Sequence, residues 1–281
     1  MSINAITKRI SKIPLIIVLF LVLFWTLLPL AWFFMISLTT VGGMPVGFSL
    51  PRVLTLRSYE RVIFGLAGYA PIWKNFFDSL VIASLTAIIV TGVSILPAYA
   101  SSRFTGKIVT GIFGFVLVLR MLPDAVMGVP FYLMYDRLGM LDNYVTMSLA
   151  ISLAMIPAGV WILKGFIDTV PRELEEQARI DGASMIQIIF RIIFPVIAPG
   201  IVVVAFLSFL WGYQNLVFPL YLSRGTIQPI SLRLLGTIGG TRVYWNEMAA
   251  LTYLSMIPVM LLYAFAGKYL VKGLIMGAVK R

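Results

Sequence analysis

The chain has 281 residues, of which 60% are hydrophobic and only 12% are charged, and its mean hydropathy is +0.98. Soluble domains carry about 25% charged residues, so this composition excludes an ordinary soluble domain and indicates a polytopic membrane protein. The sequence contains no cysteine and no histidine, which removes disulfides, thiolate chemistry and the commonest general base and metal ligand. We therefore expect no metal site, no cofactor in this chain and no enzymatic active site.

The formal net charge is +11. In a soluble protein this excess could indicate nucleic-acid binding, but here the basic residues stand at the ends of apolar runs. We interpret them as topology signals and as contacts to anionic membrane lipid, and we expect no nucleic-acid partner.

Apolar runs predict an all-α membrane protein with six transmembrane helices in a single domain over residues 1–281. The first run shares a basic start with signal peptides, but it is too long for a signal-peptide core and lacks a small-x-small cleavage site. The basic residues Lys8, Arg9 and Lys12 before it predict a cytoplasmic N-terminus, and six spans then place both termini in the cytoplasm. The spans are expected at about residues 13–36, 75–100, 107–134, 143–167, 194–222 and 247–271.

The longest segment predicted outside the membrane covers residues 40–74. Its first part is rich in glycine and proline and should be irregular, whereas residues 56–64 have the mixed pattern of a short surface helix. Such a segment could dock a partner on the outer face.

A charged island at residues 169–193 interrupts the apolar pattern between the fourth and fifth predicted spans. Pro171 suits a first helical position, and the acidic run Glu173–Glu176 opposes the positive end of the helix dipole. These features predict the start of a short exposed helix.

The end of this helix and the start of another are also predicted. Gly182 can adopt the left-handed conformation that ends a helix, and Ser184 followed three residues later by Gln187 predicts a capping box. We therefore expect two short helices over residues 171–187, joined by a tight bend.

The same residues carry a family resemblance. Glu176-Gln177-Ala178, three residues, Gly182, nine residues and Ile192-Ile193-Phe194-Pro195 resemble the E-A-A, x3, G, x9, I-x-L-P loop of the membrane subunits of bacterial ABC importers. Residues 171–184 resemble the form found in the smaller permease of the maltose-type sugar importers. Gln177 replaces an alanine and Phe194 a leucine, and both keep the helical or apolar character of the position. Residues 121–142 and 271–280 extend the resemblance.

The resemblance implies a coupling helix that sits in a cleft of a cytoplasmic ATPase subunit and tilts the spans when two such ATPases close on ATP. It also implies a second, different permease as a heterodimer partner, an external or periplasmic solute-binding protein, and a bacterial or archaeal cytoplasmic membrane. The chain lacks a phosphate-binding Gly-x4-Gly-Lys-Ser/Thr motif, so ATP and magnesium are expected on the partner ATPase. The coupling residues expected are Glu175, Glu176, Ala178, Arg179, Asp181, Gly182 and Ala183.

Two charged residues lie within the third predicted span. A charge at the bilayer centre costs about 2.5–3.5 kcal/mol on insertion scales, so Arg120 and Asp124 need an explanation. Four residues apart on one helix, they could neutralise one another at a helix contact, with Pro123 kinking the span. Alternatively, they could lie beside the translocation path, where Arg120 would meet hydroxyl or carboxylate groups of a solute.

A second pathway candidate lies in the fifth predicted span. Trp211, Tyr213, Gln214 and Asn215 combine aromatic faces, which stack on sugar rings, with amides, which pair with neighbouring hydroxyls. Aromatic residues near a membrane interface are more often anchors in the headgroup region, so both interpretations stay open.

The sequence thus favours a permease subunit of an ATP-driven ABC importer for a sugar or oligosaccharide. The same architecture could move an acidic saccharide, a phosphorylated polyol or a polyamine, and a stand-alone secondary transporter is a further alternative.

Overall fold

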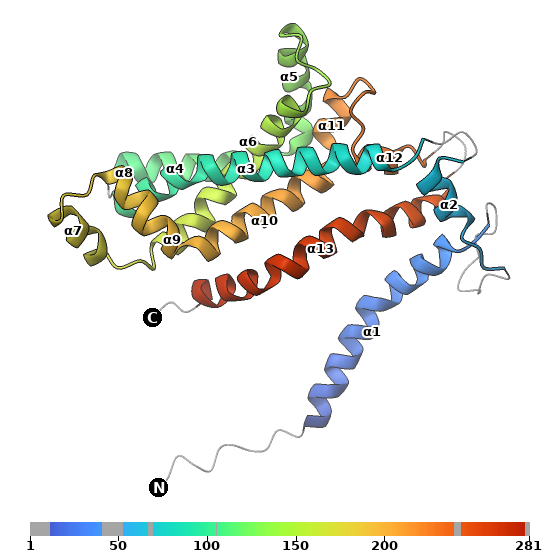
Figure 1. The fold of residues 1–281 in the computed structure, drawn as a ribbon, viewed down its shortest axis with the longest axis horizontal. Coiled ribbons are helices and arrows are strands. Elements are labelled where there is room, and N and C mark those ends of the chain that lie inside the picture. The colour runs from blue at the N-terminus through green and yellow to red at the C-terminus, as the bar shows by residue number, and fades with distance from the viewer. Residues whose placement is uncertain (1–11, 41–52, 67–69, 105, 239–242, 279–281) are drawn as a thin grey trace. The chain divides into compact units, whose positions relative to one another are not determined.

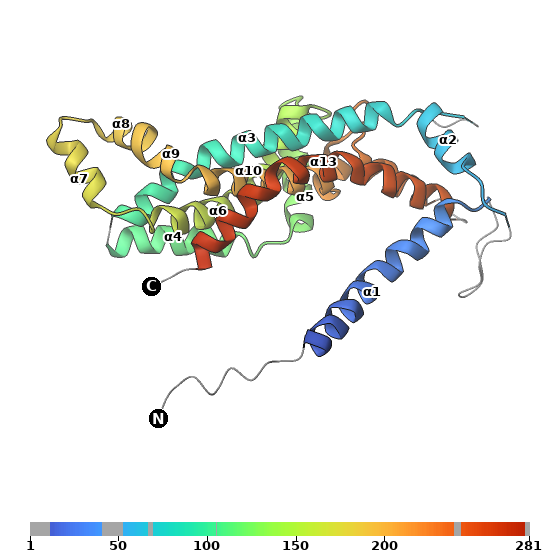
Figure 2. The same cartoon turned by 60° about the horizontal axis from the view of Figure 1, so that its bottom comes forward.

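The computed structural model describes residues 12–40, 53–66, 70–104, 106–238 and 243–278, although for 12–13 and 269–278 it describes only the course of the helix. Within these ranges the secondary structure is helical apart from one isolated bridge between Ile238 and Val243. Contacts divide the chain into two units, residues 1–71 with 237–254 and residues 72–236 with 255–281. Figures 1 and 2 show the helices.

The first unit contains α1 (Lys12–Ser37), α2 (Arg57–Phe64) and the start of α13 (Trp245–Ala278). The predicted short helix at residues 56–64 is present as α2. Its Arg61 Nη1 pairs with the buried Glu247 Oε1 of α13 at 3.1 Å, and Asn246 Nδ2 donates to Ser58 Oγ at 2.9 Å. The apolar side chains of α1 are largely exposed, as expected of a helix that meets lipid or a partner chain. Residues 41–52 of the predicted outer segment lie outside the described ranges.

The second unit is built on three helices that pack against one another, α3 (Trp73–Arg103), α6 (Tyr144–Ile167) and α10 (Ala198–Gln214). Their buried side chains form the main apolar cluster, which includes Val90, Leu163 and Val204. Gly212 permits close approach of α10 to α3, because a Cβ there would lie 2.9 Å from the Cα of Ala83.

Shorter helices complete the second unit. They are α4 (Lys107–Leu119), α5 (Asp124–Arg137), α7 (Glu173–Ile180), α8 (Met185–Gln187), the π-helical turn η2 (Ile188–Ile193), α9 (Phe194–Val196), α11 (Val217–Leu222) and α12 (Ile230–Leu235). Among the described residues, four helices are long and apolar enough to cross a membrane, beginning at Pro14, Trp73, Tyr144 and Trp245, and the number rises to six if each of two bent pairs counts as one span.

The third predicted span, 107–134, is not one continuous helix. α4 and α5 meet at 93° across residues 120–123. Pro123 has an extended conformation, with ψ 138°, and its ring nitrogen has no hydrogen to donate to a continuing helix. The break therefore turns the predicted kink into an elbow, with Arg120 on one side and Asp124 on the other.

The fifth predicted span, 194–222, is also interrupted. The helical segment before Ile197 bends by 80° relative to α10, and Pro199 at the start of α10 again removes a helical donor. α10 ends at Gln214, after which Asn215 is extended and α11 begins at Val217. Trp211, Tyr213, Gln214 and Asn215 were predicted inside one long helix. They lie instead in the last turn of α10 and directly after it.

The turn between α5 and α6 is fastened to the segment after α11 by Asp142. Its carboxylate accepts hydrogen bonds from the backbone N–H groups of Thr226 and Ile227, both at 2.9 Å. Partial burial raises the pKa of Asp142, but these N–H donors outweigh it, so that its pKa lies below the usual value.

Candidate functional site

The charged island at residues 169–193 folds into the predicted bend. α7 begins at Glu173, two residues after Pro171, and ends before Gly182, whose φ is +84°. Ser184 forms the predicted capping box with Gln187: the Gln187 N–H donates to Ser184 Oγ, and the Ser184 N–H donates to Gln187 Oε1. Local chemistry therefore sets two helices at an angle, as expected from the sequence.

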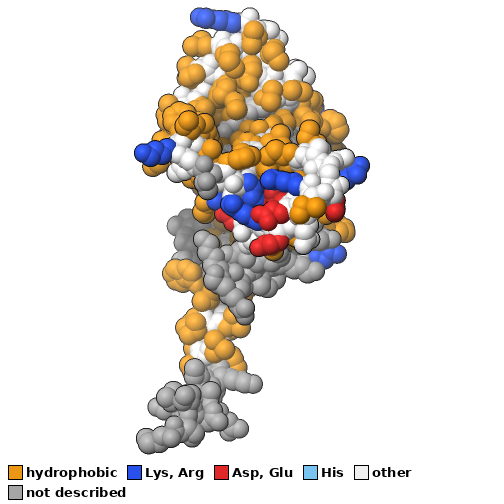
Figure 3. All heavy atoms as spheres, turned by 90° about the vertical axis from the view of Figure 1, so that its left-hand side faces the viewer, with side chains coloured by type: hydrophobic (Ala, Val, Ile, Leu, Met, Phe, Trp, Pro, Cys, Tyr) orange, Lys and Arg blue, Asp and Glu red, His pale blue; other side chains and the backbone are white. Residues whose placement is uncertain are grey.

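The exposed face of the bend combines charged and apolar side chains. Glu176, Arg179 and Asp181 are exposed, and they stand beside Ile180 and Ile186, which are 85% and 70% exposed. Figure 3 shows acidic and basic side chains gathered among apolar ones at the end of the molecule where α7 lies. Large exposed apolar side chains next to charges are typical of a surface that binds another protein.

The opposite face of α7 points into the protein. Glu175 is only 3% exposed and Ala178 is buried in the main apolar cluster, while Ala183 is half-buried. Glu175 Oε1 accepts a hydrogen bond from Arg103 Nε at 2.5 Å, and its Oε2 accepts one from Tyr99 OH at 2.6 Å. Of the predicted coupling residues, Glu175 is thus bound within this chain, whereas Glu176 and Asp181 are exposed; Arg179 is also exposed but interacts with the Tyr99 hydroxyl.

Four of the six predicted pathway residues form two contacts at the elbow between α4 and α5. The Arg120 guanidinium lies over the Trp211 ring, 4.6 Å from its centroid, and Asp124 Oδ2 accepts a hydrogen bond from Asn215 Nδ2 at 3.1 Å. No ion pair joins Arg120 to Asp124, because the backbone turns between them. Of the two alternatives for these residues, mutual neutralisation is therefore replaced by contacts to Trp211 and Asn215 at the end of α10.

The remaining members of this group have different surroundings. Tyr213 is buried and its hydroxyl donates to the carbonyl of Ser255 at 3.0 Å, while Gln214 is exposed. Asn215 also accepts the Phe218 N–H at 3.1 Å, which starts α11. In the described part of the chain, Trp211 Nε1 is buried and has no hydrogen-bond partner.

Two buried charged groups of α3 were not among the predicted residues. One is Arg103, which binds Glu175, and the other is Asp78. Asp78 is fully buried and accepts hydrogen bonds from Lys74, Tyr144 and the Gln228 N–H. A carboxylate within an apolar run, four residues after a lysine, is the signal that could have revealed Asp78.

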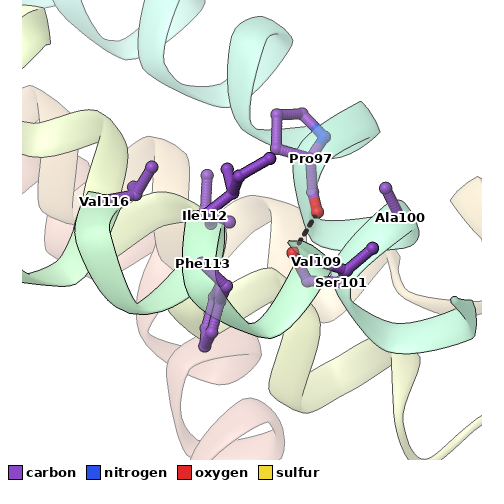
Figure 4. Close-up of a pocket in the computed structure, with 8 residues that line it drawn as sticks. Pro97, Ala100, Ser101, Val109, Ile112, Phe113 and Val116 are labelled. Carbon is purple, nitrogen blue, oxygen red and sulfur yellow. Dashed lines mark hydrogen bonds between the residues drawn. The ribbon is translucent and has the colours of Figure 1, made fainter. Parts of the chain in front are cut away.

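An apolar groove between α3 and α4 offers little to a sugar. Figure 4 shows it lined by Pro97, Ile112 and Phe113, and its volume is about 170 Å³, below the roughly 300 Å³ at which small-molecule pockets begin. The hydroxyl of Ser101 is already used, because it donates to the Pro97 carbonyl at 2.7 Å. The elbow therefore offers more polar groups than this groove does.

A bundle of apolar helices with a polar elbow inside it and a charged two-helix bend at one end defines a multi-pass membrane protein. Residues 91–276 match the family described as binding-protein-dependent transport system inner membrane component. The chain therefore belongs to this family of transport subunits and is not an enzyme.

Individual relatives match over nearly the whole chain. The trehalose/maltose transport system permease protein MalG of Thermococcus litoralis is 30% identical over 279 residues, covering 96% of this chain and 98% of that protein. The inner membrane ABC transporter permease protein YcjP of Escherichia coli is 29% identical over 283 residues, covering 97% and 98%. Among solved structures, a chain of a bacterial ABC transporter involved in the import of alginate, an acidic polysaccharide, has the same fold, with a TM-score of 0.69 at 22% identity, covering 96% of this chain and 100% of that one.

Proposed function

We propose that this chain is the permease subunit of an ATP-driven importer for a sugar or oligosaccharide. In this proposal it forms half of the translocation path together with a second, different permease. The observation that carries the proposal is the exposed face of the 171–187 bend, where apolar and charged side chains stand together at the end of the helical bundle.

The partner at this face would be one of two cytoplasmic ATPases. The chain has no phosphate-binding loop of its own, so ATP and magnesium would be held by those subunits. Ile180 and Ile186 would enter the ATPase cleft, and the carboxylate of Glu176 would meet a basic residue there. Both termini would then lie in the cytoplasm, and an external or periplasmic solute-binding protein would deliver the solute on the opposite side.

The solute would pass the elbow between α4 and α5. Trp211 Nε1 is buried and, among the described residues, has no hydrogen-bond partner, and the same holds for Thr86 Oγ1 beside Gly212. A sugar, with a hydroxyl on most carbons, could satisfy such groups as it moves. Sugars also appear in the names of relatives, including trehalose/maltose and diacetylchitobiose systems.

An acidic saccharide is the second candidate, and one observation favours it. Among the described residues no carboxylate lies within ion-pair distance of Arg120, which is only half-buried. A guanidinium with unused donors suits a carboxylate or a phosphorylated polyol. A polyamine fits less well, because Asp124 is already bonded to Asn215.

The test is uptake into proteoliposomes that contain both permeases and the ATPases, with the binding protein outside. Uptake should require ATP inside and the binding protein outside, and failure of either requirement would overturn the proposal. Neutral and uronate-containing oligosaccharides are then compared with wild type and Arg120→Gln. A loss confined to uronates would establish the acidic candidate, whereas equal uptake of neutral sugars with no uronate transport would establish the first one.

A further inference from the structure

Three side chains join the bend directly to the end of α3. Glu175, near the start of α7, accepts two hydrogen bonds. One oxygen of its carboxylate accepts from Arg103 Nε at 2.5 Å, and the other accepts from Tyr99 OH at 2.6 Å. Arg103 Nη2 also donates to the carbonyl of Val170 at 2.9 Å, just before α7. The charged side chains of Arg103 and Glu175 are only 9% and 4% exposed, so neither water nor salt screens this pair strongly.

The covalent connections of the bend are weaker mechanical links. Towards α10, the chain passes through the π-helical turn η2 and then through the 80° bend before Ala198. Such interruptions of the helical hydrogen-bond ladder are where helices bend most easily. Towards α6, residues 168–172 form a short non-helical segment. The buried ion pair therefore gives α7 a fixed attachment to a span that neither peptide connection gives.

The span to which α7 is attached leads to the polar elbow. α3 is a single helix from Trp73 to Arg103, and it touches α10 closely at Gly212, next to Trp211. Tyr99 of α3 and Ala178 of α7 belong to the same buried apolar cluster. A displacement of α7 therefore moves the Arg103 end of α3, and α3 contacts α10 at Gly212, beside the elbow residue Trp211.

We infer that the Arg103–Glu175–Tyr99 cluster is the joint through which movement of the bend passes to α3, and that these three residues are positioning residues for transport. This inference rests on the proposed function, since it assigns the step that follows contact with an ATPase. Glu175 does not contact the ATPase, whereas its neighbour Glu176 does. Loss of the joint leaves the ATPase docked and active but disconnects it from the spans.

The test measures ATP hydrolysis and solute uptake separately in the reconstituted transporter. Glu175→Gln and Arg103→Lys should keep the ATPase bound and hydrolysing, and should lower the solute imported per ATP at least fivefold. Glu173→Gln is the matched control, because it makes the same change on the exposed first turn of the same helix. Tyr99→Phe removes one hydrogen bond and should give a smaller loss.

A cross-link distinguishes a mechanical joint from a general packing role. The chain has no cysteine, so an Arg103→Cys, Glu175→Cys double variant can be bridged by a short reducible bis-methanethiosulfonate. The double variant should be uncoupled, the bridge should restore uptake per ATP, and reduction should remove the gain. If bridging restores nothing, or if Glu175→Gln keeps the wild-type ratio, the inference is wrong. If wild type itself binds no ATPase, the proposed function fails instead.

Discussion

Gly182 offers the sharpest test of the bend, because its substitution changes conformation without creating a clash. Its φ is +84°, and a Cβ built there would have no atom within 4 Å. The cost of Gly182→Ala is therefore the left-handed backbone itself, about 1–2 kcal/mol for a residue with a Cβ. An energy of this size lowers the population of the native bend relative to other arrangements by a factor of roughly 5–30.

The assay is solute imported per ATP hydrolysed in proteoliposomes. We expect Gly182→Ala to lower this ratio at least fivefold, and Gly182→Asn to lower it less, because asparagine tolerates the left-handed region better. Gly139→Ala is the matched control: Gly139 has φ +65°, equally open surroundings and a place in the turn after α5. Equal losses in the Gly182 and Gly139 variants, or no loss in Gly182→Ala, would refute the reasoning.

Two further predictions concern the second unit. The pKa of Asp142 is lowered in the folded protein, so the stabilising contribution of its carboxylate is present above the unfolded pKa, near 4, and disappears as pH falls through the folded value. The melting temperature measured in detergent should therefore fall less between pH 5 and 3 in Asp142→Asn than in wild type. Equal falls in the two proteins would contradict this. Gly212→Val should lower the free energy of unfolding by about 1–3 kcal/mol through overpacking, and with it the melting temperature, since its Cβ would lie 2.9 Å from the Ala83 backbone. An unchanged melting temperature would show that α10 and α3 separate freely.

The features that the sequence predicts well are those set by neighbouring residues. A glycine with no Cβ penalty, followed by a serine and a glutamine three residues apart, is enough to define the bend at Gly182 and its capping box. Hydrophobic run lengths likewise predict an all-helical membrane protein, because lipid tolerates no unpaired backbone. In both cases the determining physics acts within a few residues or through the solvent.

The partners of charged residues depend on tertiary packing, and the sequence does not reveal them. Arg120 and Asp124 look like an i,i+4 pair only if one helix continues through them. The elbow instead brings Arg120 to Trp211 in α10 and Asp124 to Asn215, just after α10. Glu175 and Glu176 are adjacent acids on a short helix, and only the position of Arg103, 72 residues earlier in the chain, decides which one is buried. A helix of eight residues carries too little hydrophobic periodicity to orient itself.

The most direct test of the central claim is the environment of the tip of the bend. In a chain without cysteine, Ile180→Cys places a unique thiol at a position that is 85% exposed. In intact cells it should resist a membrane-impermeant maleimide, and in the assembled transporter a short cross-linker should join it to the ATPase subunit. Labelling from outside intact cells, or absence of any cross-link to the ATPase, would contradict the account.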